Sequence, residues 1–236
     1  MIQLNSITLA FGERRLVEGV TTRFECGRMV ALLGRNGTGK STLLRAMAKL
    51  GDVAEGEILV DGKSIADIDI RQFARLVAFV NTERVDVEAL SAYDLVAIGR
   101  SPYTDWLGRL TDADRVVIER SMRITGVEHL AERMVETLSD GECQRVMIAR
   151  ALAQQTPIIL LDEPTAFLDL PTRHEVCSLL HRLAHEEGKT ILFSTHDLDI
   201  AISQCDMAAI IDSPRLIYRP MAEVGEDVER IFGISK

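Results

Sequence analysis

The nine residues GRNGTGKST, from Gly34 to Thr42, have the types and the spacing needed to bind a chain of phosphates. Gly34 and Gly39 enclose four residues and precede Lys40 and Ser41, which is the G-x-x-x-x-G-K-[ST] pattern. Glycines let the backbone wrap an anion closely, so that amide groups point at it. We expect Lys40 to contact the β- and γ-phosphates and Ser41 to bind Mg²⁺.

Such a loop must join a strand to a helix, and the flanking residues predict both. Residues 29–33, MVALL, form a short apolar run typical of a buried strand. Residues 41–50, STLLRAMAKL, are good helix formers with apolar residues at helical spacing. An ordinary glycine-rich turn is the alternative, and the strand and helix on either side argue against it.

A second run, IILLDEPT at residues 158–165, ends a predicted buried strand in two acids. We expect this strand to lie beside the one that feeds the loop, with Asp162 holding Mg²⁺ through water. Glu163 would stand outside the sheet, where a carboxylate can accept a proton from an attacking water. This arrangement favours hydrolysis over transfer of a phosphoryl group to a bound substrate. A capping or surface pair of acids is the alternative.

The segment LSDGECQR, residues 138–145, precedes another helical run. Ser139 and Glu142 have the spacing of a capping box, in which each side chain bonds to the backbone amide of the other residue. A helix N-terminus with a serine and a glycine is also an anion site. The same residues therefore fit a structural role and a binding role.

The rest of the chain predicts an α/β fold. Strands are expected at residues 2–9 (as an edge strand), 15–24, 57–60, 75–80, 157–161 and 190–194, and a helix at 171–187. This alternation indicates a mainly parallel sheet with helices on both faces, plus an N-terminal antiparallel β part. We expect a single domain over 1–236, with a P-loop NTPase core at 1–83 and 155–236. A helical subdomain is expected to be inserted at about 84–154, where apolar residues follow helical periods.

Composition limits the class of protein. The net charge is −9, from 36 acidic and 27 basic residues, which argues against a nucleic-acid surface. The four cysteines are scattered, without a C-x-x-C pair, as in reduced cytosolic proteins. We expect neither a signal peptide nor a transmembrane segment, because the sequence shows no such pattern.

Taken together, GRNGTGKST, LSDGECQ, LLDEPT, FLD at 167–169 and STHD at 194–197 resemble the nucleotide-binding subunit of an ABC transporter. The resemblance covers essentially the whole chain, in the family's order and spacing. It implies ATP and Mg²⁺ as cofactors. It also implies a homodimer, in which each ATP lies between the phosphate loop of one copy and the LSDGE segment of the other.

The resemblance assigns a role to each matching residue. Phe11 would stack on adenine, although a core or edge-strand phenylalanine is the alternative. Glu163 would be the general base, and His196 would contact the γ-phosphate as the second catalytic residue. Ser41 and Asp162 would hold the metal, and Asp169 would bridge the two sites of the dimer. The phosphate-binding residues would be Gly34, Arg35, Asn36, Gly37, Thr38, Gly39, Lys40, Ser41 and Thr42. Those that reach the partner copy's ATP would be Ser139, Asp140, Gly141 and Glu142.

Two positions depart from the family pattern. Thr82 stands where the family has a glutamine that helps to hold Mg²⁺ and links the core to the helical part. Because a threonine hydroxyl is shorter than a glutamine amide, we expect Thr82 not to bind the metal directly and its segment to act mainly as a hinge. Asp140 replaces the first glycine of the family's LSGG segment. A carboxylate there is unfavourable near a triphosphate unless it points away or pairs with a cation.

Residues 96–114, VAIGRSPYTDWLGRLTDAD, are most similar to importers of iron–siderophore complexes, haem and cobalamin. This similarity implies two integral membrane permease subunits as partners, an external substrate-binding protein acting through them, and no nucleic acid. The chain would then be peripheral, on the cytoplasmic face of the inner membrane. The alternatives are a soluble ATPase of iron–sulfur assembly, an importer of another substrate, and a DNA-repair or chromosome ATPase, for whose coiled-coil or zinc insertion the chain has no room.

Two smaller groups of side chains each allow two interpretations. Tyr103 and Trp106 would help to form the groove that receives a membrane-subunit helix, or would pack inside the helical part. His174, His181 and His185 lie roughly on one face of the 171–187 helix and could bind a metal, although their charged neighbours favour a solvated face.

Overall fold

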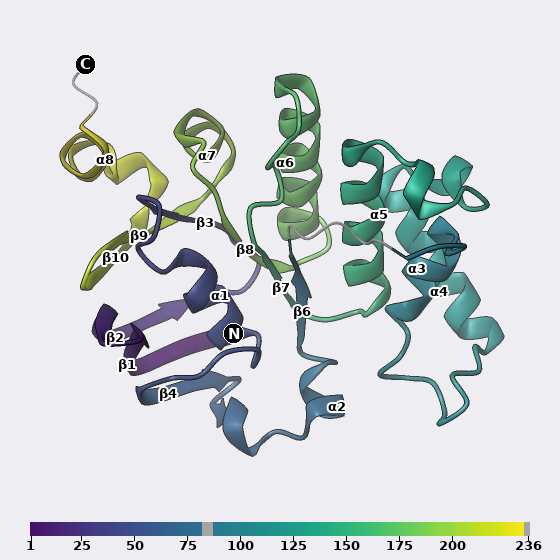
Figure 1. Ribbon diagram of the computed structural model, residues 1–236, viewed down its shortest axis with the longest axis horizontal. Coiled ribbons are helices and arrows are strands. Elements are labelled where there is room, and N and C mark those ends of the chain that lie inside the picture. The colour runs from purple at the N-terminus through teal and green to yellow at the C-terminus, as the bar shows by residue number, and fades with distance from the viewer. Residues whose placement is uncertain (82–86, 234–236) are drawn as a thin grey trace.

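The computed structural model describes residues 1–81 and 87–233 and contains two β-sheets (Figure 1). The smaller sheet is antiparallel, in the order β2–β1–β4–β5. Its strands are β1 (Ile2–Phe11), β2 (Arg14–Phe24), β4 (Glu55–Val60) and β5 (Lys63–Ser64). β1 lies between β2 and β4, so the prediction of an edge strand at residues 2–9 is wrong. The alternation along one strand shows which face is buried but not how many neighbours the strand has.

The larger sheet has the order β10–β9–β3–β8–β7–β6, and only β10 is antiparallel to its neighbour. Its strands are β3 (Met29–Gly34), β6 (Val77–Val80), β7 (Ile158–Leu161), β8 (Thr190–Ser194), β9 (Met207–Asp212) and β10 (Arg215–Pro220). β8 separates β7 from β3, so the strand that ends at Asp162 is not the direct neighbour of the strand that feeds the phosphate loop. The order could not be predicted because all three strands are continuous apolar runs.

The helices connect these strands. They are α1 (Lys40–Met47), α2 (Ile70–Phe73), α3 (Ala92–Ile98), α4 (Asp112–Thr125), α5 (Asp140–Ala153), α6 (Leu170–His185), α7 (Leu198–Gln204) and α8 (Gly225–Phe232). Single 3₁₀ turns occupy Ile65–Asp67, Glu128–Leu130, Val135–Thr137 and Met221–Glu223. None of the helices in the described ranges has the length and apolar character needed to cross a membrane.

The larger sheet buries both of its faces, as the continuous apolar strands predict. Val30 and Leu32 of β3 belong to a core shared with α1 and the smaller sheet. Ala31 and Leu33, which alternate with them, belong to a second core shared with the helices on the opposite face. The sheet is therefore the middle layer, and the loops at the carboxyl ends of its parallel strands are held from both sides.

Helices α3, α4 and α5 pack against one another beyond β6 (Figure 1). Their buried side chains form one continuous core with the larger sheet. Two polar contacts tie the last turn of α5 to β6, because Arg150 Nη2 donates to the Phe79 carbonyl at 3.1 Å and Gln154 Nε2 donates to the Val77 carbonyl at 3.1 Å. The boundaries of a helical subdomain at about 84–154 stay a prediction.

Candidate functional site

The phosphate loop forms a tight turn between β3 and α1. Gly34 has a φ of +152° and Gly39 a φ of +105°, values that favour glycine. A Cβ atom on Gly34 would also lie 2.7 Å from Thr38 Oγ1 and 3.0 Å from the carbonyl oxygen of Ile211. Thr38 Oγ1 donates to the Arg35 carbonyl at 2.8 Å. The glycine at position 34 of the sequence pattern therefore matches a backbone conformation that a residue with a Cβ atom would disturb.

Lys40 is buried at the start of α1. Its Nζ donates to the carbonyl oxygens of Gly34 at 3.0 Å and Arg35 at 3.4 Å. Burial lowers the pKa of Lys40, and the nearby carboxylates of Glu163 and Asp162 oppose this shift. Because a charge-assisted bond to a phosphate is stronger than a bond to a neutral carbonyl, this ammonium group can exchange its partners for an anion.

Ser41 and Asp162 meet at the start of α1, although they are far apart in the sequence. Ser41 Oγ donates to Asp162 Oδ1 at 2.9 Å, and Asp162 is buried just after β7. A hydroxyl beside a carboxyl group supplies the oxygen ligands that Mg²⁺ prefers. The two residues predicted to hold the metal therefore lie together and fit that ion.

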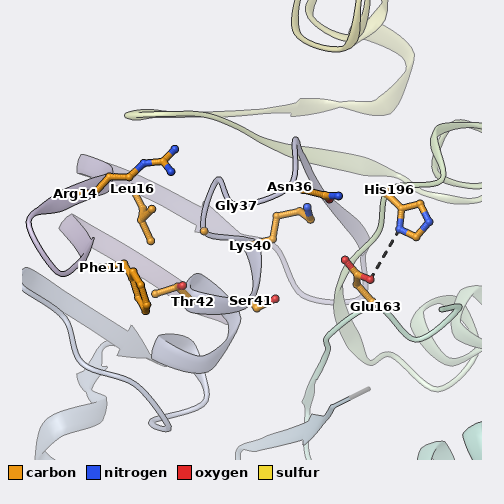
Figure 2. Close-up of a pocket in the computed structure, with 11 residues that line it drawn as sticks. Phe11, Arg14, Leu16, Asn36, Gly37, Lys40, Ser41, Thr42, Glu163 and His196 are labelled. Carbon is orange, nitrogen blue, oxygen red and sulfur yellow. Dashed lines mark ion pairs between the residues drawn. The ribbon is translucent and has the colours of Figure 1, made fainter. Parts of the chain in front are cut away.

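Glu163 and His196 face each other near these groups (Figure 2), with 3.9 Å between Glu163 Oε2 and His196 Nδ1. Glu163 has a φ of +43°, in the left-handed region that non-glycine residues seldom adopt. Both side chains are partly exposed. A water molecule and a phosphate group can reach them.

These groups line a first cavity of about 620 Å³, a volume typical of small-molecule sites. Its lining consists of Phe11, Arg14, Leu16, Asn36, Gly37, Gly39, Lys40, Ser41, Thr42, Glu163 and His196. Phe11 lies at the end opposite His196 (Figure 2). It is 78% exposed, so the alternative of a core phenylalanine is wrong, and its ring offers a face for a planar base.

Two residues of this lining, Arg14 and Leu16, belong to none of the sequence motifs. Arg14 pairs with Phe11 across the turn between β1 and β2. Leu16 lies next to the loop, since a Cβ atom on Gly39 would be 3.0 Å from the Leu16 Cβ. The short connection between two predicted strands was the available signal, because it brings residues on both sides of the turn together.

A second cavity of about 260 Å³ lies at the start of α5. Its lining consists of Gly126, Val127, His129, Leu130, Ser139, Gly141, Glu142, Arg145 and Thr172. Ser139 caps α5 and forms the predicted capping box with Glu142. Hydrogen bonds from the amide and hydroxyl of Ser139 lower the pKa of Glu142. Asp140 is the first residue of α5.

Among the residues that the structure describes, the linings of the two cavities have none in common. Ser139 and Gly141 therefore line a different cavity from that of the chain's own phosphate loop. Asp169 caps α6 by accepting from the Thr172 amide at 3.1 Å. Hydrogen bonds from the hydroxyl and the amide of Thr172 lower the pKa of Asp169. Phe167, two residues earlier, is 87% exposed.

The remaining predicted residues separate into different outcomes. Thr82 lies outside the described residues. In the described part of the chain no three histidine, cysteine or acidic side chains form a metal site, and His185 instead contacts the His181 carbonyl at 2.9 Å and Asp206 Oδ1 at 3.0 Å.

Tyr103 packs inside the helical part, where its hydroxyl donates to the Gln154 carbonyl at 3.0 Å. Trp106 is 89% exposed, so it does not pack there.

The fold and the first cavity define a P-loop nucleotide-binding protein. The model of the ABC transporter family matches residues 17–166 of the chain. The chain belongs to this family and is one of its ATP-hydrolysing cassettes, which confirms the predicted fold class and enzyme class.

Three comparisons add detail. The iron(3+)-hydroxamate import ATP-binding protein FhuC of Bacillus subtilis is 38% identical over 200 residues, which cover 85% of this chain and 74% of that protein. A transporter assigned to the metal-chelate type, solved in an inward-facing conformation, has a TM-score of 0.87 and 26% identity and covers 99% of this chain and 89% of its own. A dimeric structure of the bacterial ABC transporter cassette MJ0796 has a TM-score of 0.79 and 28% identity, covering 94% of this chain and 99% of its own.

Proposed function

We propose that this chain is the ATP-hydrolysing subunit of an importer of iron chelates, haem or cobalamin, and that it energises uptake through separate membrane subunits. The observation that carries the hydrolytic role is that Ser41 and Glu163 both line the first cavity while Ser41 Oγ is hydrogen-bonded to the buried Asp162. Similarity to an iron-hydroxamate import protein and to a metal-chelate type transporter supports the class of cargo.

In this proposal the triphosphate of ATP lies along the loop, and the adenine stacks on Phe11 at the far end of the first cavity. Lys40 exchanges its carbonyl partners for phosphate oxygens. Glu163 accepts a proton from the attacking water, a contribution typically worth about 10²–10⁴ in rate. His196, whose Nδ1 lies 3.9 Å from Glu163 Oε2, contacts the γ-phosphate at the same end of the cavity.

Ser41 and Asp162 would hold Mg²⁺, the hydroxyl directly and the carboxylate through water. The ion, when bound there, neutralises charge that develops on the phosphate oxygens. The chain contributes two oxygen atoms in fixed positions, Ser41 Oγ and Asp162 Oδ1, which lie 2.9 Å apart.

The second cavity supports a two-copy assembly. Ser139 and Gly141 stand at the N-terminus of α5, where the partial positive charge of a helix end attracts an anion, but the phosphate loop of the same chain belongs to another cavity. In the proposed homodimer they contact the γ-phosphate bound to the partner copy, and Asp169 lies between the two sites. The dimeric structure of MJ0796 supports such an assembly.

The loop between α3 and α4 supports a membrane partner. Trp106 and Leu107 are exposed there, at 89% and 49%. The loop is nevertheless held in place, because Arg71 Nε and Arg75 Nη2 donate to the Pro102 carbonyl at 3.0 and 2.7 Å. A fixed apolar surface of this kind is suited to a helix of a permease subunit. The chain would bind there from the cytoplasmic side, with the external substrate-binding protein acting through the permease.

The test is reconstitution with a permease that co-purifies with this chain, in vesicles loaded with ATP and Mg²⁺. Uptake of a ferric hydroxamate, haem or cobalamin should depend on ATP and be lost with Glu163→Gln. Glu175→Gln, which removes an exposed carboxylate paired with Arg145, should retain uptake. The cargo assignment is wrong if none of the three compounds is taken up while an unrelated solute is.

A further inference from the structure

Ser194, the last residue of β8, connects the two acids of the candidate site. Its Oγ donates to Asp162 Oδ1 at 2.7 Å and accepts from the Glu163 amide at 2.8 Å. The residue is fully buried. One hydroxyl therefore bonds to the side chain of the proposed metal-binding acid and to the backbone of the proposed base.

The order of the strands makes this connection possible. β8 lies between β3, which feeds the phosphate loop, and β7, which ends before Asp162. Asp162 Oδ1 accepts from Ser41 Oγ at 2.9 Å on one side and from Ser194 Oγ on the other. Because Ser41 is also the proposed direct ligand of the metal, Ser194 is the partner that can hold the carboxylate while Ser41 binds the ion.

The backbone of Glu163 gives a second reason. Its φ of +43° is a strained conformation that persists only where the surroundings hold it. The hydrogen bond from its amide to Ser194 Oγ is a direct restraint on that conformation. The direction in which the Glu163 carboxylate leaves the chain depends on it.

We propose that Ser194 is a positioning residue that holds Asp162 and Glu163 in fixed relation, so that metal binding and proton acceptance occur at one site. This inference rests on the roles proposed above for the two acids. It predicts that loss of the hydroxyl impairs turnover and the response to Mg²⁺ together, while the binding of nucleotide by the loop and Phe11 is retained. If Ser194 only filled space, its loss would not impair turnover and the response to Mg²⁺ while leaving nucleotide binding unchanged.

The experiment compares wild type, Ser194→Ala, Glu163→Gln and Thr190→Val. The last variant removes a buried threonine hydroxyl from the same strand, about 13 Å from Ser194. Three quantities are measured for each: kcat and KM for ATP, the Mg²⁺ concentration that gives half-maximal rate, and the affinity for a fluorescent ATP analogue in EDTA. Thermal unfolding reports whether each variant is folded.

We expect Ser194→Ala to lower kcat about 10–100-fold and to raise the half-maximal Mg²⁺ concentration, as loss of a supporting hydrogen bond at a metal site typically does. Analogue binding in EDTA should stay within about twofold of wild type, and Thr190→Val should behave like wild type in every measurement. A folded Ser194→Ala variant with wild-type kcat and Mg²⁺ response overturns the proposal, and so does a loss of analogue binding equal to its loss of kcat. Wild-type turnover in Glu163→Gln would instead refute the role of Glu163, a different result from failure of the Ser194 proposal alone.

Discussion

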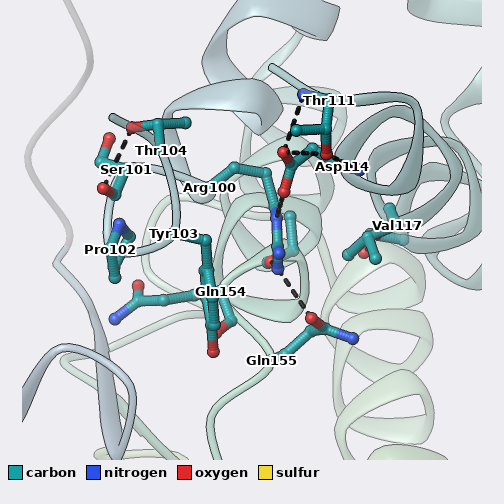
Figure 3. Close-up of polar contacts among 12 residues, drawn as sticks. Arg100, Ser101, Pro102, Tyr103, Thr104, Thr111, Asp114, Val117, Gln154 and Gln155 are labelled. Carbon is teal, nitrogen blue, oxygen red and sulfur yellow. Dashed lines mark hydrogen bonds and ion pairs between the residues drawn. The ribbon is translucent and has the colours of Figure 1, made fainter. Parts of the chain in front are cut away.

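Replacing Arg100 with methionine should destabilise the protein strongly, because this side chain is a buried cation with three polar partners. Arg100 Nε donates to Asp114 Oδ1 at 2.8 Å, and Nη1 donates to the Ala153 carbonyl at 2.7 Å and to Gln155 Oε1 at 2.8 Å (Figure 3). Its guanidinium carbon also lies 4.0 Å from the centre of the Tyr103 ring. Methionine keeps much of the apolar volume but has no donor.

The size of the stability loss depends on the buried Asp114 carboxylate, which Arg100→Met leaves without its cation. Asp114 is only 5% exposed, and breaking a buried ion pair by removing one partner typically costs about 3–5 kcal/mol. Asp114 keeps hydrogen bonds from Thr111, which lower the pKa of its carboxyl more than Arg100 does. We therefore expect a loss near the lower end, about 3 kcal/mol, and a fall in Tm of about 6–12 °C for a chain of this size.

The assay is urea unfolding followed by circular dichroism, since the exposed Trp106 is a poor reporter. Arg115→Met is the matched control: it removes another arginine from the α4 region, one whose contact with Asp112 is exposed and 3.9 Å long, and it should cost less than about 1 kcal/mol. Asp114→Asn should lower the free energy of unfolding less in the Arg100→Met protein than in the wild type. In the Arg100→Met protein it also removes the carboxylate charge that has lost its partner. The reasoning is refuted if Arg100→Met lies within 1 kcal/mol of wild type, or if the two substitutions are additive.

Three further predictions each concern one side chain. The hydrogen bond to the His181 carbonyl, followed by that to Asp206, raises the pKa of His185 above 6.5; its stabilisation is therefore complete below pH 6.5 and lost as pH rises through the folded-state pKa. His185→Gln should cost up to about 1 kcal/mol at pH 6 and nothing at pH 9 in urea titrations, and an equal cost at both pH values would contradict this. Trp106→Ser should leave the ATPase activity of the isolated chain unchanged but weaken co-purification with the permease by about 30-fold in affinity; unchanged co-purification would exclude the proposed surface. Phe11→Ala should raise the Kd of ATP about 10-fold, measured by fluorescence titration, whereas the exposed Phe167→Ala should not change binding to one chain.

The phosphate loop could be predicted because everything it needs is local. The glycines, Lys40 and the flanking strand and helix occupy one continuous stretch, and the loop geometry at Gly34 agrees with the pattern. Ser139 and Glu142 were predictable for the same reason, since a capping box joins residues three apart.

The contacts between distant segments could not be predicted in this way. Apolar runs of similar composition form β3, β7 and β8, so the position of β8 between the other two, and with it the hydrogen bonds of Ser194, emerged only from the structure. Tyr103 and Trp106 illustrate the same limit within one loop. Both are aromatic residues in one predicted helical region, yet one is held by Gln154 and Arg100 and the other is exposed.

The central claim is that ATP is bound between two copies of this chain and hydrolysed with Glu163 as the base. Light scattering of Glu163→Gln in ATP and Mg²⁺ tests it most directly, with Glu163→Gln/Ser139→Arg as the control. We expect twice the 26.2 kDa mass of the chain for the single variant, with very slow hydrolysis, and the monomer mass for the double variant. A monomeric Glu163→Gln protein that hydrolyses ATP at the wild-type rate would contradict it.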